Sequence, residues 1–177
     1  MTKFRRTIPI AIVPLALSLA ATGEARAETV TASDPEQGCS YAAALDVRRA
    51  TFSYRKNAFL VRLKMGDLSK KRTQVLGRYI VGSPDDTKLD VMLISKHVDG
   101  ERKTFGRLTD YANEEYDNHF TKGVNAKWDW NANTVTFTLT NHLQGKKATG
   151  AAYSVPKGAQ HGDPCGDYIV VRGIRRG

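Results

Sequence analysis

Apolar and polar residues alternate most regularly in the stretch from Leu45 to Leu68. The apolar parity of its second half holds four residues: Phe59, Val61, Leu63 and Met65. The opposite parity holds Leu60, Arg62 and Lys64. A period of two is typical of a strand with one buried face. The polar run 55–57 divides the stretch, so the pattern predicts a β-hairpin with a short turn.

Further strand patterns follow along the chain, and helix-forming sequence is nearly absent. The predicted strands are Gln74–Val81, Lys88–Lys96, a strand through Phe105 and Leu108, one extended segment Phe120–Trp130, then Thr134–Thr140, Ala151–Val155 and Asp167–Arg172. We expect Asp110–Asn118 to form a helical turn or an irregular acidic loop, and Gly145–Gly150 a polar loop. The spacing predicts an all-β fold, a single antiparallel sandwich of about eight or nine strands, either jelly-roll or immunoglobulin-like.

The first 27 residues have the three parts of a secretory signal peptide. Lys3, Arg5 and Arg6 form a basic start, an apolar run follows from Ile8 to Ala21, and Ala25–Ala27 is an A-x-A cleavage motif. The apolar run is shorter than the ~20 residues that a membrane-spanning helix needs, and no other run approaches that length. The sequence therefore predicts an exported protein without a transmembrane segment. The Arg5-Arg6 pair leaves the twin-arginine route open beside the general secretory route.

Cleavage after residue 27 changes the charge of the chain. The whole sequence holds 27 basic and 18 acidic residues, a net charge of +9. Removing four basic residues and one acidic residue leaves 23 and 17, a net charge of +6. A positive surface favours anionic partners, and it also keeps a protein soluble. We expect residues 28–44 to form a polar lead-in and residues 45–177 one sandwich domain.

The two cysteines, Cys39 and Cys165, lie near the two ends of the predicted mature chain. Exported proteins meet an oxidising environment, so we expect a disulfide between them. It would close a loop of about 126 residues and add on the order of 4–5 kcal/mol to stability by restricting the unfolded chain. The disulfide would tie the polar lead-in to the domain.

Leu45–Arg49, the hairpin sequence LVRLKMGDL, and a late Trp128-Asp129-Trp130 followed by Thr134–Leu139 resemble a known group of proteins. These are small secreted actinobacterial β-sandwich proteins of the DOMON or carbohydrate-binding-module type. The resemblance covers roughly Leu45–Leu143, and it implies a jelly-roll-like fold that binds an extracellular ligand. Proteins of this type bind haem or sugars, but no ligand residue of theirs matches a position in this chain, so no cofactor is predicted.

Two groups of residues are candidates for binding. Trp128 and Trp130 share a parity, and flat aromatic rings exposed in this way stack on sugars. Tyr111 and Tyr116 would complete such a platform, although the apolar strand Thr134–Thr140 beside the tryptophans favours core packing for them. The second group is basic and lies on and around the hairpin: Arg48, Arg49, Arg55, Lys56, Arg62, Lys64, Lys70, Lys71 and Arg72. Arg62 and Lys64 share its outer face, which suits an anionic polymer or is simply solvated.

One acidic group is a candidate for Ca²⁺, a cation that takes six to eight oxygen ligands. It consists of Asp110, Glu114, Glu115 and Asp117. The spacing does not fit a known calcium loop, so a solvated acidic loop is the favoured interpretation. The four histidines, His97, His119, His142 and His161, are isolated in sequence and form no zinc motif.

No G-x-S-x-G or H-E-x-x-H motif marks an active site in this sequence. The sequence therefore predicts a secreted, non-catalytic binding module whose ligand is a glycan or an anionic cell-wall polymer. Intracellular nucleic acid is disfavoured because the chain is exported. A small secreted metal-dependent hydrolase and a structural or inhibitory protein-interaction domain remain as alternatives.

Overall fold

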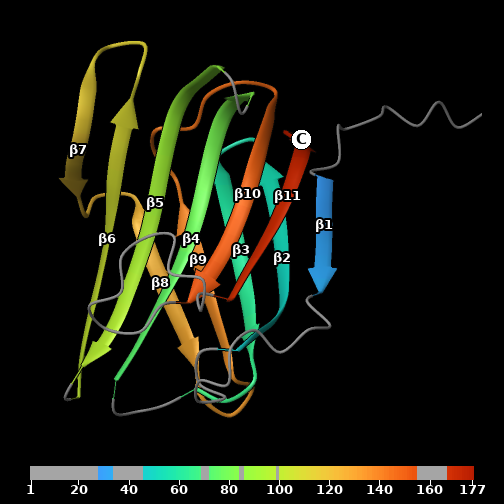
Figure 1. Ribbon diagram of the computed structural model, residues 1–177, viewed down its shortest axis with the longest axis vertical. Coiled ribbons are helices and arrows are strands. Elements are labelled where there is room, and N and C mark those ends of the chain that lie inside the picture. The colour runs from blue at the N-terminus through green and yellow to red at the C-terminus, as the bar shows by residue number, and fades with distance from the viewer. Residues whose placement is uncertain (1–27, 34–45, 69–71, 84–85, 99, 155–166) are drawn as a thin grey trace, which may run out of the picture.

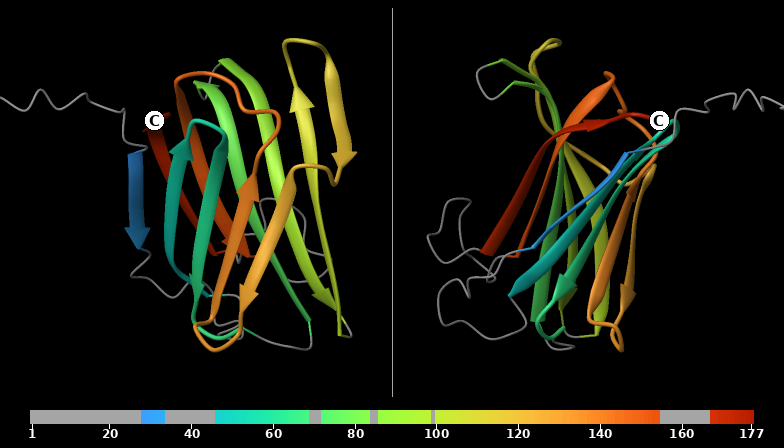
Figure 2. Two further views of the ribbon diagram at one scale, coloured as in Figure 1. Left: turned by 180° about the vertical axis from the view of Figure 1, so that it is seen from behind. Right: turned by 90° about the vertical axis from the view of Figure 1, so that its right-hand side faces the viewer.

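A computed structural model describes residues 28–33, 46–68, 72–83, 86–98, 100–154 and 167–177. Within these ranges the chain forms eleven β-strands and no helix. The strands build two antiparallel sheets that pack against each other, as the edge-on view in Figure 2 shows. The predicted all-β sandwich is confirmed, with more strands than the eight or nine expected. The segment predicted to be a signal peptide, and the two cysteines predicted to form a disulfide, Cys39 and Cys165, lie outside the described residues.

The first sheet has five strands in the order β1-β2-β3-β9-β8 (Figure 1). Their bounds are β1 Glu28–Ser33, β2 Val47–Arg55, β3 Ala58–Met65, β8 Val124–Asp129 and β9 Thr134–Leu139. The second sheet has six strands in the order β11-β10-β4-β5-β6-β7. Their bounds are β4 Arg72–Ser83, β5 Asp86–Val98, β6 Glu101–Asp110, β7 Glu115–Phe120, β10 Lys147–Ser154 and β11 Asp167–Arg175.

The predicted hairpin is the pair β2 and β3, joined by the two-residue turn Lys56-Asn57. All four apolar side chains on the inner parity of β3 are fully buried: Phe59, Val61, Leu63 and Met65. Burying an aliphatic or aromatic side chain of this size contributes about 1.5–3 kcal/mol each. The alternation seen in the sequence therefore puts the apolar side chains of β3 on the buried face. A shift of one residue would expose them, so the alternation also fixes the register of the hairpin.

The core lies between the two sheets. Apolar side chains from β2, β3 and β9 of the first sheet meet those from β4, β5 and β10 of the second. Gly150 on β10 makes room for the Phe52 ring, because a Cβ at Gly150 would lie 2.3 Å from Phe52 Cδ1. β5, which contains the predicted strand Lys88–Lys96, lies between β4 and β6. A smaller apolar cluster of Leu76, Ile94 and Tyr153 is separate from the main core.

Four sequence predictions are wrong in detail. The segment Asp110–Asn118 is neither a helical turn nor a continuous irregular loop, because its residues 115–118 belong to β7 and pair with β6. Residues 28–33 are not a loose lead-in but the edge strand β1, paired with β2 from Glu28↔Tyr54 to Ser33↔Arg49. The segment Phe120–Trp130 is not one strand, since β7 ends at Phe120 in one sheet and β8 begins at Val124 in the other. Gly123, with a φ of +78°, lies in the turn between them. The last part of Gly145–Gly150 belongs to β10, because pairing with β4 and β11 extends that strand to Lys147.

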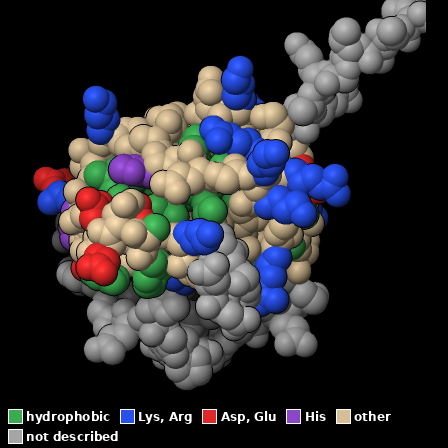
Figure 3. Space-filling view, turned by 90° about the horizontal axis from the view of Figure 1, so that it is seen from above, with side chains coloured by type: hydrophobic (Ala, Val, Ile, Leu, Met, Phe, Trp, Pro, Cys, Tyr) green, Lys and Arg blue, Asp and Glu red, His purple; other side chains and the backbone are tan. Residues whose placement is uncertain are grey.

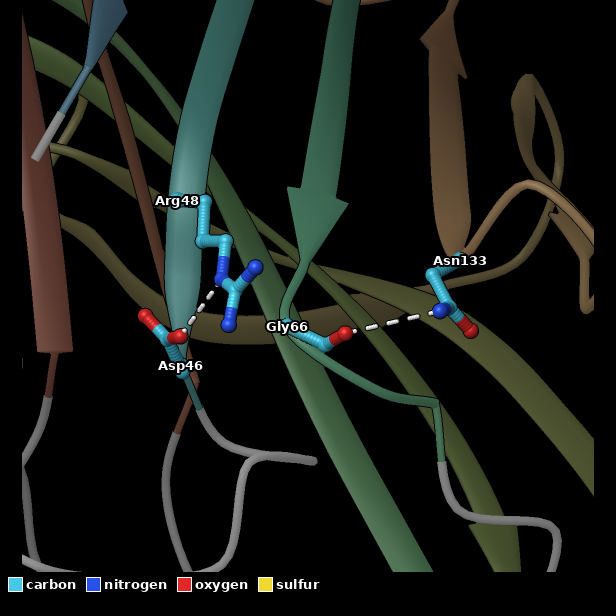
Figure 4. Close-up of polar contacts among 4 residues, drawn as sticks. All are labelled: Asp46, Arg48, Gly66 and Asn133. Carbon is cyan, nitrogen blue, oxygen red and sulfur yellow. Dashed lines mark hydrogen bonds and ion pairs between the residues drawn. The ribbon is translucent and has the colours of Figure 1, made fainter.

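The side-chain amide of Asn133 links the β8–β9 turn to the chain after β3 at the lower end of the first sheet (Figure 4). Asn133 sits in the β8–β9 turn at a φ of +48°, a conformation that asparagine tolerates. Its Nδ2 donates to the Gly66 carbonyl at 3.4 Å, and its Oδ1 accepts from the Leu68 N–H at 3.1 Å. Arg48 pairs with Asp46 at 2.9 Å on the neighbouring strand. The two hydrogen bonds of Asn133 hold the chain that leaves β3 against the β8–β9 turn, whereas the Arg48–Asp46 pair is local to the start of β2.

Candidate functional site

An open depression with a volume of about 710 Å³ lies where the β2–β3 turn, the start of β10 and the end of β11 meet. These strand ends are at the upper end of the sandwich in Figure 1. We call it the basic depression, and its lining is Lys56, Asn57, Lys146, Lys147, Arg175, Arg176 and Gly177. Three segments far apart in sequence supply these residues: the β2–β3 turn, the start of β10 and the end of β11. Lys147 and Arg175 are brought side by side because they are Cα partners in the β10–β11 ladder.

Arg176 is held in place by three kinds of contact. Its backbone N–H donates to the Lys146 carbonyl at 2.9 Å, and its guanidinium Nε donates to the Lys56 carbonyl at 3.1 Å. The guanidinium carbon also lies 5.3 Å from the centre of the Tyr54 ring, within the range of a cation–π contact. Gly177 N–H donates to the Tyr54 carbonyl at 3.0 Å. Arg176 therefore joins the end of the chain to the β2–β3 hairpin and forms part of the floor of the basic depression.

A buried pair of tyrosines fixes the loop that carries Lys146. The Tyr79 hydroxyl donates to the Gln144 carbonyl at 2.6 Å and accepts from the Gln144 N–H at 2.8 Å. The Tyr54 hydroxyl lies 2.7 Å from the same carbonyl. Burial and the hydrogen bond to Tyr54 raise the pKa of Tyr79 well above its ordinary value. Both hydroxyls thus hold the loop by ordinary hydrogen bonds, and a neutral Tyr79 adds no negative charge beneath the cations.

The charge of the basic depression is strongly positive. Five of its side chains are cationic, and within the described part of the chain none of the five forms an ion pair with a carboxylate. The nearest acidic contact is made by Glu28, whose Oε2 accepts from the Arg175 N–H at 2.6 Å. Clustered cations on one surface attract anions and raise their local concentration. The arrangement is suited to binding an anionic group.

The predicted basic face continues along the outer side of the five-stranded sheet. Cross-strand pairing places Arg49 beside Lys64, and Thr51 beside Arg62. Across β3 and β9, Arg62 is the partner of Thr136, whose other neighbour is Lys127. Lys64 Nζ donates to the Ala132 carbonyl at 2.6 Å, whereas Arg48 is paired with Asp46. The structure brings Arg62 and Lys64 together on one face, as predicted, among threonine side chains.

The aromatic candidates do not form one platform. Trp128 is 6% exposed, its Nε1 donates to Ser95 Oγ at 2.9 Å, and it packs in the core with the Trp130 ring 5.1 Å away. Tyr111 and Tyr116 lie at the opposite end, since β8 runs down to the lower end in Figure 1 and β6 runs up to the upper end. The two tyrosines are 48% and 62% exposed. The four candidates therefore form two separate aromatic pairs, and Trp128 packs in the core, the interpretation that the sequence favoured.

The acidic candidates also do not converge. Asp110 is buried and accepts from the Ala112 and Asn113 N–H groups at 3.1 and 3.2 Å, which makes it the cap of the β6–β7 turn. Asp117 forms an ion pair with Arg107 on the neighbouring strand. Glu114 and Glu115 are exposed. In the described ranges no three His, Cys, Asp or Glu side chains lie close enough together to hold a metal ion.

The histidines are also dispersed. His97 is buried against the Trp130 ring at 4.9 Å, whereas His119 and His142 are exposed and contact Phe105 and Phe120. His161 lies outside the described residues. Three of the four histidines therefore pack singly against aromatic rings, without a shared site.

Sequence reasoning missed four of the five cations of the basic depression. Lys146-Lys147 and Arg175-Arg176 are visible as basic pairs, like Arg55-Lys56 in the predicted hairpin turn. Only the order β11-β10-β4 and the contact of β11 with β2 bring the three pairs to one place. A basic pair at each of three strand ends was the available signal.

Comparison with protein-family models, with curated proteins and with solved structures found no match. The resemblance to DOMON or carbohydrate-binding modules therefore stays a prediction from the sequence. In the part of the chain that the structure describes, no helix is long and apolar enough to cross a membrane.

Proposed function

We propose that this protein is an exported, non-catalytic binding module whose ligand is an anionic polymer, held in the basic depression. The observation that carries the proposal is the meeting of Lys56, Lys146, Lys147, Arg175 and Arg176 in one open hollow. Open, solvated cations bind a flexible polyanion by releasing its counterions and need no enclosed pocket. Arg49, Arg62, Lys64 and Lys127 on the adjoining sheet face extend the positive surface along which such a polymer would run.

A cell-wall polymer is the ligand class that fits an exported protein. Phosphodiester and carboxylate groups along such a polymer supply repeated negative charges. Both kinds of cation in the basic depression suit these ligands, because the lysine ammonium group is a mobile point charge and the arginine guanidinium group binds phosphate and carboxylate oxygens in pairs. The cations of the basic depression would attract any polyanion, so the test compares polymers of different charge.

The test measures binding of a purified phosphodiester wall polymer, with dextran as the uncharged comparison. We expect binding to the polyanion alone, and an affinity that falls as salt rises, with a log–log slope of about −0.7 for each charge neutralised. The double variant K146Q/K147Q should lose on the order of tenfold in affinity and reduce the slope by about 1.4. The control R102Q/K103Q removes two exposed cations at the opposite end of the sandwich and should change affinity less than about twofold.

Salt-independent binding would overturn the proposal. Equal losses in the two variants would also overturn it, because net charge rather than the basic depression would then decide binding. Tight binding of dextran that the lysine variants leave unchanged would point instead to recognition of an uncharged glycan.

Export and the disulfide belong to the same proposal. The A-x-A motif at Ala25–Ala27 supports this part of the proposal, and it places the start of the mature chain at Glu28. Mass spectrometry of the protein recovered from the medium should give a chain that starts at Glu28. Non-reducing peptide mapping of the same sample should give one cross-linked peptide that contains Cys39 and Cys165. An intact N-terminal segment, or two free thiols in the exported protein, would refute the corresponding statement.

A further inference from the structure

The turn between β6 and β7 carries the two most exposed large apolar side chains in the described part of the chain, Tyr111 and Tyr116. Their rings lie 6.1 Å apart, nearly edge to face. We call residues 111–117 the β6–β7 tip, and it projects at the upper left of Figure 1. Exposed tyrosines are a common feature of protein interfaces, because they bury a large area at a small cost in side-chain entropy.

The β6–β7 tip is held in one conformation. Asp110 caps the turn by accepting from two backbone N–H groups and from Asn113 Nδ2 at 2.9 Å. Tyr111 N–H donates to the Lys88 carbonyl at 3.0 Å, which anchors the turn to β5. A surface whose aromatic side chains stand on a rigid turn loses little freedom on binding. The tip is therefore preorganised for contact.

The charge of the β6–β7 tip is negative. Glu114, Glu115 and Asp117 are exposed carboxylates. Two basic residues adjoin them: Arg107, which Asp117 neutralises, and Lys88. Tyrosine rings and carboxylates on one turn suit a partner rich in Lys or Arg, because cations bind over aromatic faces and pair with carboxylates.

The basic depression is such a surface, and it lies on the same end of the molecule. Figure 3 looks down on that end and shows Asp and Glu side chains on the left and a concentration of Lys and Arg side chains on the right. The end face of the sandwich thus has an acidic, aromatic side and a basic side. A twofold axis that lies in this face, between the two sides, would place the acidic side of one copy on the basic side of the other.

We infer that the protein forms a twofold dimer in which the β6–β7 tip of each copy contacts the basic depression of the other copy. Twofold interfaces use the same surface patch on both subunits, so each unlike-charge contact occurs twice. The acidic side chains involved are Glu114 and Glu115, and the basic ones are Lys146, Lys147 and Arg175. Both patches lie on the same end of the molecule, so in the dimer each copy uses both of its patches on the other copy. No patch is left to bind a third copy, and the assembly is a closed dimer and not a filament.

A consequence is competition at the basic depression. A second copy would cover the cations that the proposed function assigns to the anionic polymer. Polymer would then dissociate the dimer, and dimer formation would weaken polymer binding. This competition rests on the proposed function, but the dimer itself does not.

The experiment uses the exported chain and two charge-reversal variants, E114K/E115K and K146E/K147E. Sedimentation equilibrium from about 1 µM to about 1 mM protein covers the range in which weak interfaces saturate. At about 0.05 M salt we expect the unaltered protein to dimerise, with a dissociation constant that rises on the order of tenfold at about 0.5 M salt. Each variant alone should be monomeric, because it presents like charges to its own copy.

Mixing the two variants should restore the dimer. In the mixed pair, the basic tip of E114K/E115K meets the acidic depression of K146E/K147E, and the remaining two patches keep their original charges. All substituted residues are exposed at the surface, and circular dichroism confirms that both variants are folded. R102E/K103E, at the opposite end, is the control and should dimerise like the unaltered protein.

A monomeric unaltered protein across the whole range at low salt would overturn the inference. A mixture that stays monomeric, or a single variant that dimerises, would do the same. Dimers of the unaltered protein with no binding of polyanion would overturn the proposed function and leave this inference standing. Polyanion binding by a protein that is always monomeric would overturn the inference alone.

The variant Y111S/Y116S tests the aromatic part of the contact. It should weaken the dimer on the order of tenfold without loss of polymer affinity, and an unchanged dimer would count against the contact.

Discussion

The hydroxyl of Tyr54, on one sheet, lies 2.8 Å from the hydroxyl of Tyr79, on the other. Their rings meet edge to face at 5.5 Å, and both hydroxyls contact the Gln144 carbonyl. This pair couples the sandwich core to the loop that carries Lys146. Above it, Arg176 lies over the Tyr54 ring. The basic depression is therefore built on a buried, hydrogen-bonded floor.

Replacing Tyr79 by Phe tests whether the Tyr79 hydroxyl stabilises the loop beneath the basic depression. The substitution removes two part-buried hydrogen bonds to the Gln144 backbone, and at about 0.5–1.5 kcal/mol for each bond the loss is about 1–3 kcal/mol. We expect the free energy of unfolding, measured by urea titration, to fall by that amount with an unchanged slope m. Tyr116→Phe is the control, since its side chain is 62% exposed, and it should change stability by less than about 0.5 kcal/mol. Equal effects of the two substitutions would show that the Tyr79 hydroxyl does not hold the loop.

Buried tyrosines also predict instability at alkaline pH. Burial raises the pKa of Tyr153 to about 12, and burial together with the Tyr54 hydroxyl raises the pKa of Tyr79 as well. A tyrosine in the unfolded chain loses its proton near pH 10, so above that value the unfolded state binds fewer protons than the native state. Stability is then complete below about pH 10 and falls as pH rises through the native pKa values.

Urea midpoints at pH 8 and about pH 11 measure this alkaline effect. We expect a lower midpoint at the higher pH, and a smaller drop in Tyr79→Phe, because that variant has lost one of the groups responsible. An equal drop in the variant would mean that other groups account for the alkaline loss.

The hairpin β2–β3 could be predicted from sequence because one face of it is entirely buried. Phe59 and Leu63 are apolar where the alternation demands it, and no competing period runs through the segment. β1 is different. Val30 and Ala32 face inward but are only partly buried, and the strand exists because it pairs with β2, which no local pattern reveals.

The break between β7 and β8 shows a second limit. Phe120 and Val124 have the same parity, and only Lys122 interrupts the apolar pattern across a turn that moves the chain from one sheet to the other. Gly123 was the local signal of that turn. The basic depression was beyond prediction for a related reason, because Lys56, Lys147 and Arg175 meet only through the strand order. The buried state of Trp128 followed from its apolar neighbours, which favoured the core.

The close approach of Gly150 to Phe52 predicts that a single methyl group is costly. A Cβ at Gly150 would lie 2.3 Å from the Phe52 ring, which is fully buried and cannot move aside. We expect Gly150→Ala to lower the free energy of unfolding by about 1–3 kcal/mol, as overpacked cores generally do. Gly77→Ala is the matched comparison, because its added Cβ would meet Val61 and Phe137 at 3.3 Å, and it should cost less. Equal losses measured by urea titration would contradict the contact.

Glu28 offers a way to test where the anionic ligand binds. Its carboxylate accepts from the Arg175 N–H at 2.6 Å, so it sits beside the basic depression and partly offsets the positive charge there. Glu28→Gln keeps an oxygen acceptor and removes the negative charge. An exposed charge several ångströms from the ligand is worth a few tenths of a kcal/mol in water, so affinity for the phosphodiester polymer should rise about two- to threefold at low salt.

The control is Glu101→Gln, which makes the same charge change at the opposite end of the sandwich. Glu101 is exposed there, and its substitution should leave affinity nearly unchanged. Equal gains in the two variants would mean that overall charge alone governs binding, and a loss in Glu28→Gln would place the polymer elsewhere.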